Sequence, residues 1–307
     1  MSAPREYCSS LARAANETLA GTASHARGCL LISYPKRLWA RQALESDGLP
    51  PALRATLARL VDEQDVVTRL VAHEGEWRGR VEVSLFPQRR RHRDVALDDV
   101  AALLESARPD VGELLTDPLI ACCTHGVRDR CCALFGMELV RALRDAAAAS
   151  GARVEIREAS HLGGDRFAPT VLVLPSGHMF GHLEPSDAPS LIVSALGGAP
   201  LRARFRGSLW LDPLEQLAEV AALDAARREH AALWPTSLSI AREVHDDHHA
   251  TLRVRASFGT DQVELELACT LERKLVVGDC RSADTKRRGS VAVWKMDSVR
   301  STRVYGR

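Results

Sequence analysis

Hydrophobic and polar positions in the first hundred residues form short apolar runs, separated by stretches in which apolar side chains recur with helical spacing. The apolar runs at 29–34, 66–72 and 79–86 predict strands. Helices are expected at 35–61 and 94–106. The predicted order of elements is therefore β-α-β-β-α.

The next hundred residues repeat this order. The unit has roughly the size of a thioredoxin, and its cysteine-containing loop follows the first strand, where thioredoxins carry their active-site turn. We therefore predict an α/β protein with tandem thioredoxin-like domains at 1–110 and 111–210, of which only the second has a metal motif. The elements expected in the second unit are strands at 119–123, 153–158, 170–174 and 178–183 and helices at 132–149 and 187–196.

From about residue 211 the pattern changes again. An amphipathic helix is expected at 213–230, followed by a hairpin of strands at 251–256 and 262–268. Two more short strands are expected around Leu275 and Val291. The tail is therefore predicted to be a smaller α+β extension over 211–307.

Candidate chemistry is concentrated in one loop of the second unit. A sulfur that only fills space has no need of three sulfur neighbours, so clustered cysteines are expected to be ligands or redox groups. About forty residues after the first pair, His161 and Asp165 flank a Gly-Gly pair that lets the backbone approach closely. The two segments are expected to form the walls of one metal site. The clustered cysteines are Cys122, Cys123, Cys131 and Cys132.

The donor types in these segments favour an iron–sulfur cluster, which thiolate and imidazole groups hold. Cys123 and Cys132 form a Cys-x8-Cys pair across the turn from strand to helix, and His161 and Asp165 form an x3-spaced pair. This arrangement predicts a [2Fe-2S] site between two adjacent loops. Zinc fits these residues less well, because structural zinc usually draws on closely spaced pairs such as Cys-x2-Cys.

The same segments resemble a known family. The sequence C-T-H-G-V-R-D-R-C-C at 123–132, followed by H-L-G-G-D-R-F-A at 161–168 and L-P-S-G-H-M-F-G at 174–181, is similar to the sucrase/ferredoxin-like family. C-S-S-L-A-R at 8–13, L-A-G-T-A at 19–23 and F-R-G at 205–207 extend the resemblance. It implies a thioredoxin-like protein whose [2Fe-2S] cluster is bound by two cysteines and by two histidines of an H-x-G-G-H loop.

By motif position, the resemblance implies that Cys123 and Cys132 are the cysteine ligands and His161 is the first histidine. The second histidine position holds Asp165. A carboxylate is a hard, poor ligand for cluster iron, so the fourth donor stays open. Asp165 could bind the iron, or it could hydrogen-bond His161 while another group supplies the fourth donor. The other candidates are Cys131, Cys122, Cys280 and His178.

Polar residues beside these ligands have expected supporting roles. His125 is expected to support the loop or donate a hydrogen bond to sulfur. Arg128 and Asp129 are expected to form an ion pair that fixes the turn, with Arg128 offsetting the charge of the cluster. Arg166 is expected to act in the same way. Cys122, next to Cys123 in an alternating strand, is expected to face the opposite side of the sheet.

Charge and composition exclude several functions. The chain has 41 basic and 40 acidic residues, so no long-range field draws it to nucleic acid or to an anionic membrane. The arginine-rich run at 89–93 is expected to be a solvated loop. Residues 1–20 contain charges and no apolar signal-peptide core, so we expect a cytoplasmic protein. Clustered cysteines in that compartment favour metal or redox chemistry over structural disulfides.

The leading hypothesis is therefore an electron carrier rather than an enzyme, a ferredoxin that exchanges one electron with an unidentified reductase or acceptor protein. Its reduction potential is expected to depend on pH if His161 is a ligand. One alternative is a metal-free thiol-disulfide protein, although the Cys-x-x-Cys spacing of that chemistry is absent. The other is a scaffold or binding protein without a cluster.

Overall fold

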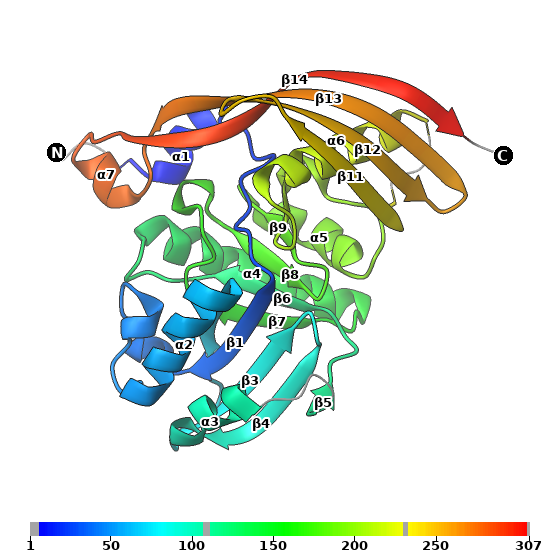
Figure 1. The fold of residues 1–307 in the computed structure, drawn as a ribbon. Helices are drawn as coiled ribbons and strands as arrows, with labels where there is room; N and C mark the ends of the chain where they lie inside the picture. Colours follow the sequence, from blue (N-terminus) through cyan, green and yellow to red (C-terminus); the bar gives the residue numbers. More distant parts are fainter. Residues whose placement is uncertain (1–5, 107–110, 230–232, 306–307) are drawn as a thin grey trace.

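The chain is built around a ten-stranded mixed sheet, with a separate four-stranded antiparallel sheet beside it. The computed structural model describes residues 6–106, 111–229 and 233–305. The strand order is β10-β9-β8-β6-β7-β2-β1-β3-β4-β5 in the large sheet and β11-β12-β13-β14 in the small one. Figure 1 shows the small sheet across one end of the molecule, with α6 beneath it. The predicted α/β class is confirmed.

The first half of the large sheet is formed by residues before 107. In it, β1 pairs in parallel with β2 and antiparallel with β3, which pairs with β4. Two helices, α2 and α3, pack against each other. The bounds are β1 (Gly28–Tyr34), α2 (Pro51–Gln64), β2 (Val66–Ala72), β3 (Arg80–Phe86), β4 (Arg90–Ala96) and α3 (Val100–Ser106).

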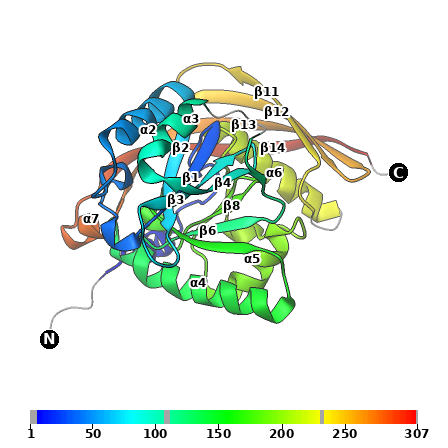
Figure 2. The same cartoon turned by 90° about the horizontal axis from the view of Figure 1, so that it is seen from below.

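The second half has the same arrangement of strands. Here β6 pairs in parallel with β7 and antiparallel with β8, which pairs with β9, and α4 lies beside α5 (Figure 2). The halves join where β2 runs antiparallel to β7, with Val71 opposite Ala159. The bounds are β6 (Leu119–Cys123), α4 (Arg130–Ser150), β7 (Glu155–Ala159), β8 (Val171–Leu174), β9 (His178–Phe180) and α5 (Ala188–Ala195).

Both halves therefore contribute to one continuous sheet. The division into domains at 1–110 and 111–210 stays a prediction, and its boundary at residue 110 lies outside the described residues.

The remaining elements include a strand that the sequence pattern missed, β11. The strands expected around Leu275 and Val291 are parts of the long strands β13 and β14. The predicted end of α6 at His230 lies outside the described residues. The bounds are α1 (Cys8–Ala14), β5 (Glu113–Leu114), β10 (Phe205–Ser208), α6 (Pro213–Glu229), β11 (Ser237–Val244), β12 (His249–Phe258), β13 (Asp261–Val276), α7 (Cys280–Asp284) and β14 (Gly289–Tyr305).

The long helix expected at 35–61 is wrong in its first part. Only short 3-10 turns form before α2, which begins at Pro51. The residue before a proline avoids the helical region, so Leu49 and Pro50 prevent a helix from running through to α2. Proline is well tolerated in the first turn, where its missing N–H has no partner to lose.

Side chains alternate between the two faces of a strand, and this alternation decides which of them meet on each face of the sheet. In β6, Ile120 and Cys122 join the core that contains Leu139 and Val140 of α4. Cys123 lies in a different core cluster, together with Leu31 of β1. Successive side chains of a strand point to opposite faces, so Cys122 and Cys123 are separated by the sheet itself.

The arginine-rich run is a strand, which corrects both the loop expected at 89–93 and the helix expected from residue 94. Residues Arg90–Ala96 form β4, and the Arg91 side chain is 4% exposed. Arg91 lies 3.3 Å from a carboxylate oxygen of Glu82 and 2.6 Å from one of Glu155. These carboxylates, one on the neighbouring strand β3 and one on β7, compensate a buried charge that would otherwise be costly.

Removing the Arg91 side chain should destabilise the fold, because Glu82 and Glu155 lose the most buried cation that they share and keep only their longer or more exposed pairs with Arg157 and Arg93. We expect Arg91→Ala to lower the free energy of unfolding by about 3–5 kcal/mol, measured by urea denaturation at pH 7. The matched control is Arg93→Ala in the same strand, whose side chain is 56% exposed. We expect it to cost no more than about 1 kcal/mol. Equal losses in the two variants would contradict this account of Arg91.

Glu219 of α6 is a buried acid that should make stability depend on pH. Its carboxylate accepts hydrogen bonds from the Ser208 N–H at 3.0 Å and from the Ser208 hydroxyl at 2.6 Å. Burial raises the pKa of Glu219 from 4.5 to about 7. Stability from this group is therefore fully present below pH 4.5 and is lost as pH rises through about 7.

Glu219→Gln should remove that loss, since glutamine keeps an acceptor for the Ser208 N–H without an ionisable proton. We expect the variant to be more stable than the wild type at pH 8 by about 2–4 kcal/mol. At pH 4.5 the difference should be small. Urea denaturation at both pH values measures this, and parallel pH profiles would contradict it.

Candidate metal centre

The four side chains singled out by the sequence meet at one edge of the large sheet. Cys123 is the last residue of β6, and His161 lies two residues after the end of β7. Because β6 and β7 are parallel neighbours, their carboxyl ends lie at the same edge. Cys132 is in the first turn of α4, and Asp165 begins the 3-10 turn Asp165–Phe167 that precedes β8.

Direct contacts join these groups. His161 Nδ1 lies 2.7 Å from Asp165 Oδ1, and the Cys132 thiol donates to the same oxygen at 3.5 Å. Cys123, Cys132 and Asp165 are buried, whereas the His161 side chain is 26% exposed. The imidazole is therefore the member of the set that reaches solvent.

Two glycines allow the segments that carry these side chains to pack closely together. A Cβ on Gly136 of α4 would lie 2.1 Å from the carbonyl oxygen of Cys123, so only glycine lets α4 pack this closely on β6. Gly164, between His161 and Asp165, has a φ of +78°, which favours glycine. A side chain there would also collide with the buried guanidinium of Arg206, which donates to the Gly163 carbonyl at 3.0 Å.

The electrostatics of the site favour the anionic forms of Cys123 and Asp165 and the neutral thiol of Cys132. The neighbouring Cys132 thiol and the His161 imidazole hold the pKa of Cys123 well below its usual range despite burial. Cys132 takes the opposite shift, because the Cys123 and Cys131 sulfurs beside it raise its pKa. Burial opposes ionisation of Asp165, but His161 and then Arg128 outweigh it and lower the pKa of Asp165. Burial likewise opposes charge on His161, yet Asp165 and Cys123 raise its pKa.

Two of the expected supporting residues, His125 and Arg128, contact this set, whereas Arg166 pairs outside it. His125 is buried, and its Nδ1 accepts a hydrogen bond from the His161 N–H at 3.2 Å. Arg128 contacts Asp165 at 3.3 Å rather than the adjacent Asp129. Arg166 pairs with Glu17 at 2.7 Å. The expected Arg128–Asp129 ion pair is replaced because the Asp129 carboxylate instead caps α4, accepting from the Cys131 N–H at 3.0 Å.

The other candidates for a fourth donor lie elsewhere, except for Cys131, whose thiol is beside the Cys132 sulfur and contacts the Asp165 carbonyl at 3.6 Å. Cys122 is on the opposite face of the sheet, where its thiol contacts the Gly136 carbonyl at 3.6 Å. His178 stacks on Trp234 with ring centroids 3.5 Å apart. Cys131 and Cys280 belong to a neighbouring cluster of sulfurs. Asp165 is therefore the candidate that directly contacts both His161 and Cys132.

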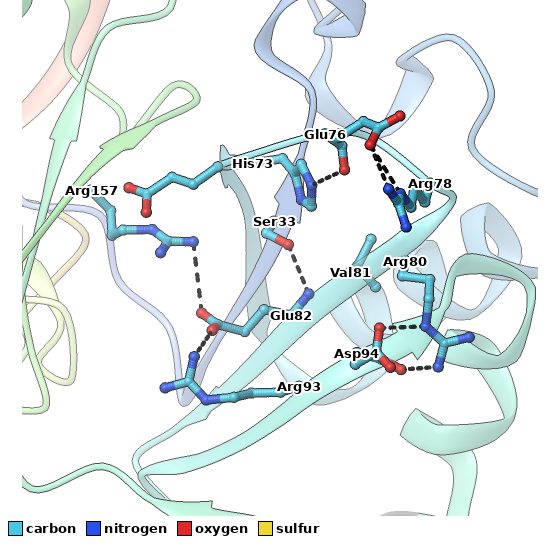
Figure 3. Close-up of a pocket in the computed structure, with 11 residues that line it drawn as sticks. Ser33, His73, Glu76, Arg78, Arg80, Val81, Glu82, Arg93, Asp94 and Arg157 are labelled. Atoms are coloured by element: carbon cyan, nitrogen blue, oxygen red, sulfur yellow. Dashed lines mark hydrogen bonds and ion pairs between the residues drawn. The ribbon is translucent and has the colours of Figure 1, made fainter.

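A polar hollow of about 400 Å³ lies over the first half of the sheet, away from these residues (Figure 3). Its arginines are paired with carboxylates. Arg80 pairs with Asp94, Arg78 with Glu76, and both Arg93 and Arg157 with Glu82. These contacts leave little free positive charge for an anionic ligand, and we assign no site there.

A mixed α/β fold with two buried thiols, an imidazole and a carboxylate at one sheet edge defines a candidate metalloprotein. The chain belongs to the sucrase/ferredoxin-like family, whose profile matches residues 19–207. No curated protein matches the chain. Within the described residues, no helix is both long and apolar enough to cross a membrane.

Similar solved structures include thioredoxin-like [2Fe-2S] ferredoxins. One, from Aquifex aeolicus, shares 19% identity over 31% of this chain and 94% of its own, with a TM-score of 0.27. The wild-type ferredoxin from the same organism shares 18% identity over 30% of this chain and 97% of its own, with a TM-score of 0.26. The proposal below rests on the family and on the site, not on these two structures.

The donor set fits an iron–sulfur group. Two buried sulfurs and one imidazole nitrogen are donors that cluster iron accepts, and they converge from loops that the sheet fixes. Asp165 is the one hard donor. Because Asp165 contacts His161 directly, one of the two side chains must rotate if both are to bind iron.

Proposed function

We propose that this protein is an electron carrier that holds a [2Fe-2S] cluster through Cys123, Cys132, His161 and Asp165. The observation that carries the proposal is the convergence of two buried thiols and one imidazole at a single sheet edge, in a chain that belongs to the sucrase/ferredoxin-like family. When bound, such a cluster accepts and releases one electron.

The surrounding residues suit a group that carries negative charge. Arg128 lies beside Asp165, and the buried Arg206 interacts electrostatically with the same carboxylate. These cations offset negative charge at donor atoms that are largely buried. Low dielectric surroundings strengthen such interactions.

His161 provides the contact with solvent and thus with a redox partner. Its side chain is the partly exposed member of the donor set, at 26%. We propose that an unidentified reductase or acceptor protein docks over this imidazole. If the exposed nitrogen titrates, the midpoint potential will fall as pH rises through its pKa, and redox titrations between about pH 6 and pH 9 measure this.

Anaerobically purified protein tests the proposal. We expect equal amounts of iron and acid-labile sulfide, visible absorption that bleaches on reduction, and an EPR signal in the reduced state. Protein that stays colourless and takes up no iron on reconstitution would overturn the proposal. It would favour a metal-free thiol-disulfide protein or a scaffold instead, and disulfide formation during a glutathione redox titration would distinguish these two.

A further inference from the structure

Beside the candidate cluster site lies a second group of potential ligands that the proposed function does not use. It consists of Cys8, Asp129, Cys131 and Cys280, whose ligand atoms all lie within 4.8 Å of one another. All four residues are buried. Cys8 and Cys280 lie outside the part of the chain that matches the family profile, residues 19–207.

The four residues come from three separate segments. Cys8 begins α1, Asp129 and Cys131 lie at the start of α4, and Cys280 begins α7 in the connection between β13 and β14. Figure 1 shows α1 and α7 side by side at the same end of the molecule, where they pack against each other. The N-terminal helix and the C-terminal hairpin thus meet at the start of α4.

Distances within the group match the edges of a metal tetrahedron. The Cys8 sulfur lies 3.4 Å from that of Cys131 and 3.7 Å from that of Cys280. Zinc–sulfur bonds of about 2.3 Å at tetrahedral angles place two sulfurs about 3.8 Å apart. A disulfide would need about 2.05 Å, and all eight cysteines are free.

The carboxylate of Asp129 supplies a fourth donor. Its Oδ1 lies 3.0 Å from the Cys131 sulfur and its Oδ2 lies 3.7 Å from the Cys8 sulfur. Backbone N–H groups of Cys131 and Cys280 donate to the same carboxylate at 3.0 and 2.6 Å, which fixes its orientation. Besides capping α4, the buried carboxylate is thus held against two of the three sulfurs, where it completes a set of four donors.

The set is distinct from the candidate cluster site although Cys131 and Cys132 are adjacent. Successive residues of a helix point about 100° apart. The Cys132 thiol contacts the Asp165 carboxylate, whereas the Cys131 thiol contacts the Cys8 sulfur and the Asp129 carboxylate and meets Asp165 at its backbone carbonyl, at 3.6 Å. One turn of α4 therefore divides its two cysteines between two sites.

We propose that Cys8, Asp129, Cys131 and Cys280 bind one Zn²⁺ ion, which fastens the N-terminal helix and the C-terminal hairpin to the start of α4. Zinc suits this role because it forms closed tetrahedral sites with sulfur and carboxylate ligands and has no redox chemistry. The site goes beyond the proposed electron transfer and does not depend on it.

Metal analysis of the full-length protein tests this site directly. We expect about one zinc per chain, lost in Cys8→Ser and Cys280→Ser while iron content and visible absorption persist. Matched controls are Cys29→Ser and Cys269→Ser, two buried cysteines outside both sites, which should keep the zinc. Absence of zinc from wild-type protein after zinc reconstitution would overturn the proposal. Loss of iron in Cys8→Ser and Cys280→Ser, with no loss in the controls, would also overturn it by assigning these cysteines to the iron site.

A second measurement covers the case in which the serine variants do not fold. Co²⁺ titrated into the Cys123→Ala, Cys132→Ala double variant should give the absorption of a tetrahedral site with three thiolates. Absence of that absorption, or an intact mass that shows a disulfide in anaerobically purified protein, would refute the zinc site. A wild-type protein with zinc but without iron would overturn only the electron-transfer proposal.

Discussion

Replacing Cys123 with alanine should abolish the iron content and visible absorption of the protein. The side chain is fully buried at the end of β6, beside Cys132 and His161, and the other cysteine of β6, Cys122, points to the opposite face of the sheet. Loss of even an indirect support typically weakens metal binding ten- to a hundredfold, so we expect iron to fall below about a tenth of the wild-type value. Iron analysis and absorption spectra of anaerobically purified protein measure this.

The adjacent cysteine provides the control. Cys122→Ala removes a sulfur of the same burial, one residue away, from the opposite face of the sheet. We expect it to cost stability through the lost packing in the core beneath α4 while iron content and spectrum stay at the wild-type level. Equal loss of iron in both variants would show that the effect comes from unfolding, and a Cys123→Ala protein with normal iron would remove Cys123 from the ligand set.

Changing Asp165 to histidine should keep the cluster and raise its midpoint potential. The variant restores the H-x-G-G-H sequence of the bis-histidine pattern and replaces an anionic donor by a neutral one. A less negative cluster environment makes reduction more favourable. The potential should also become more dependent on pH, because a second imidazole can titrate. Redox titrations followed by absorption, at several pH values, measure both effects.

Arg128→Gln should shift the potential in the other direction. The guanidinium lies 3.3 Å from Asp165, so its removal takes away a positive charge that stabilises the reduced cluster. The matched control is Arg130→Gln, two residues away, because Arg130 pairs with Asp284 instead. If Asp165→His and Arg128→Gln both left the potential unchanged, neither side chain would be near the bound cluster.

The sequence was sufficient to predict that the candidate donors share one site, because local patterns of apolar residues indicate where the strands that carry them end. Apolar runs located β6 and β7, and the parallel pairing of these strands in the structure brings Cys123 and His161 to the same edge. Period-two alternation likewise placed Cys122 on the other face. These features depend on residues close in sequence.

The features that the sequence did not predict depend on distant residues. Arg91 lies in a strand because Glu82 and Glu155 compensate its charge, and Glu155 is 64 residues away. Without these distant partners, the arginine-rich sequence at 89–93 is typical of a polar loop. Cys8 looks like a lone small hydrophobic residue and Cys280 like a turn residue that could at most complete the cluster site, and 272 residues separate them. Only the packing of α1 against α7 shows that they belong to one group.

The pairing of β2 with β7 gives a structural task to the half of the chain that carries none of the four donors. Ser160, the residue before His161, donates its N–H to the Leu70 carbonyl at 2.7 Å, and its hydroxyl accepts from the Leu70 N–H at 2.9 Å. Without β2, the edge of β7 would expose unpaired backbone groups that invite association with other chains. Residues before 107 therefore support the site mechanically. A shortened protein that lacked them would keep the four candidate cluster ligands, but it would lose Cys8 of the proposed zinc site and the backbone pairing that holds His161 in place.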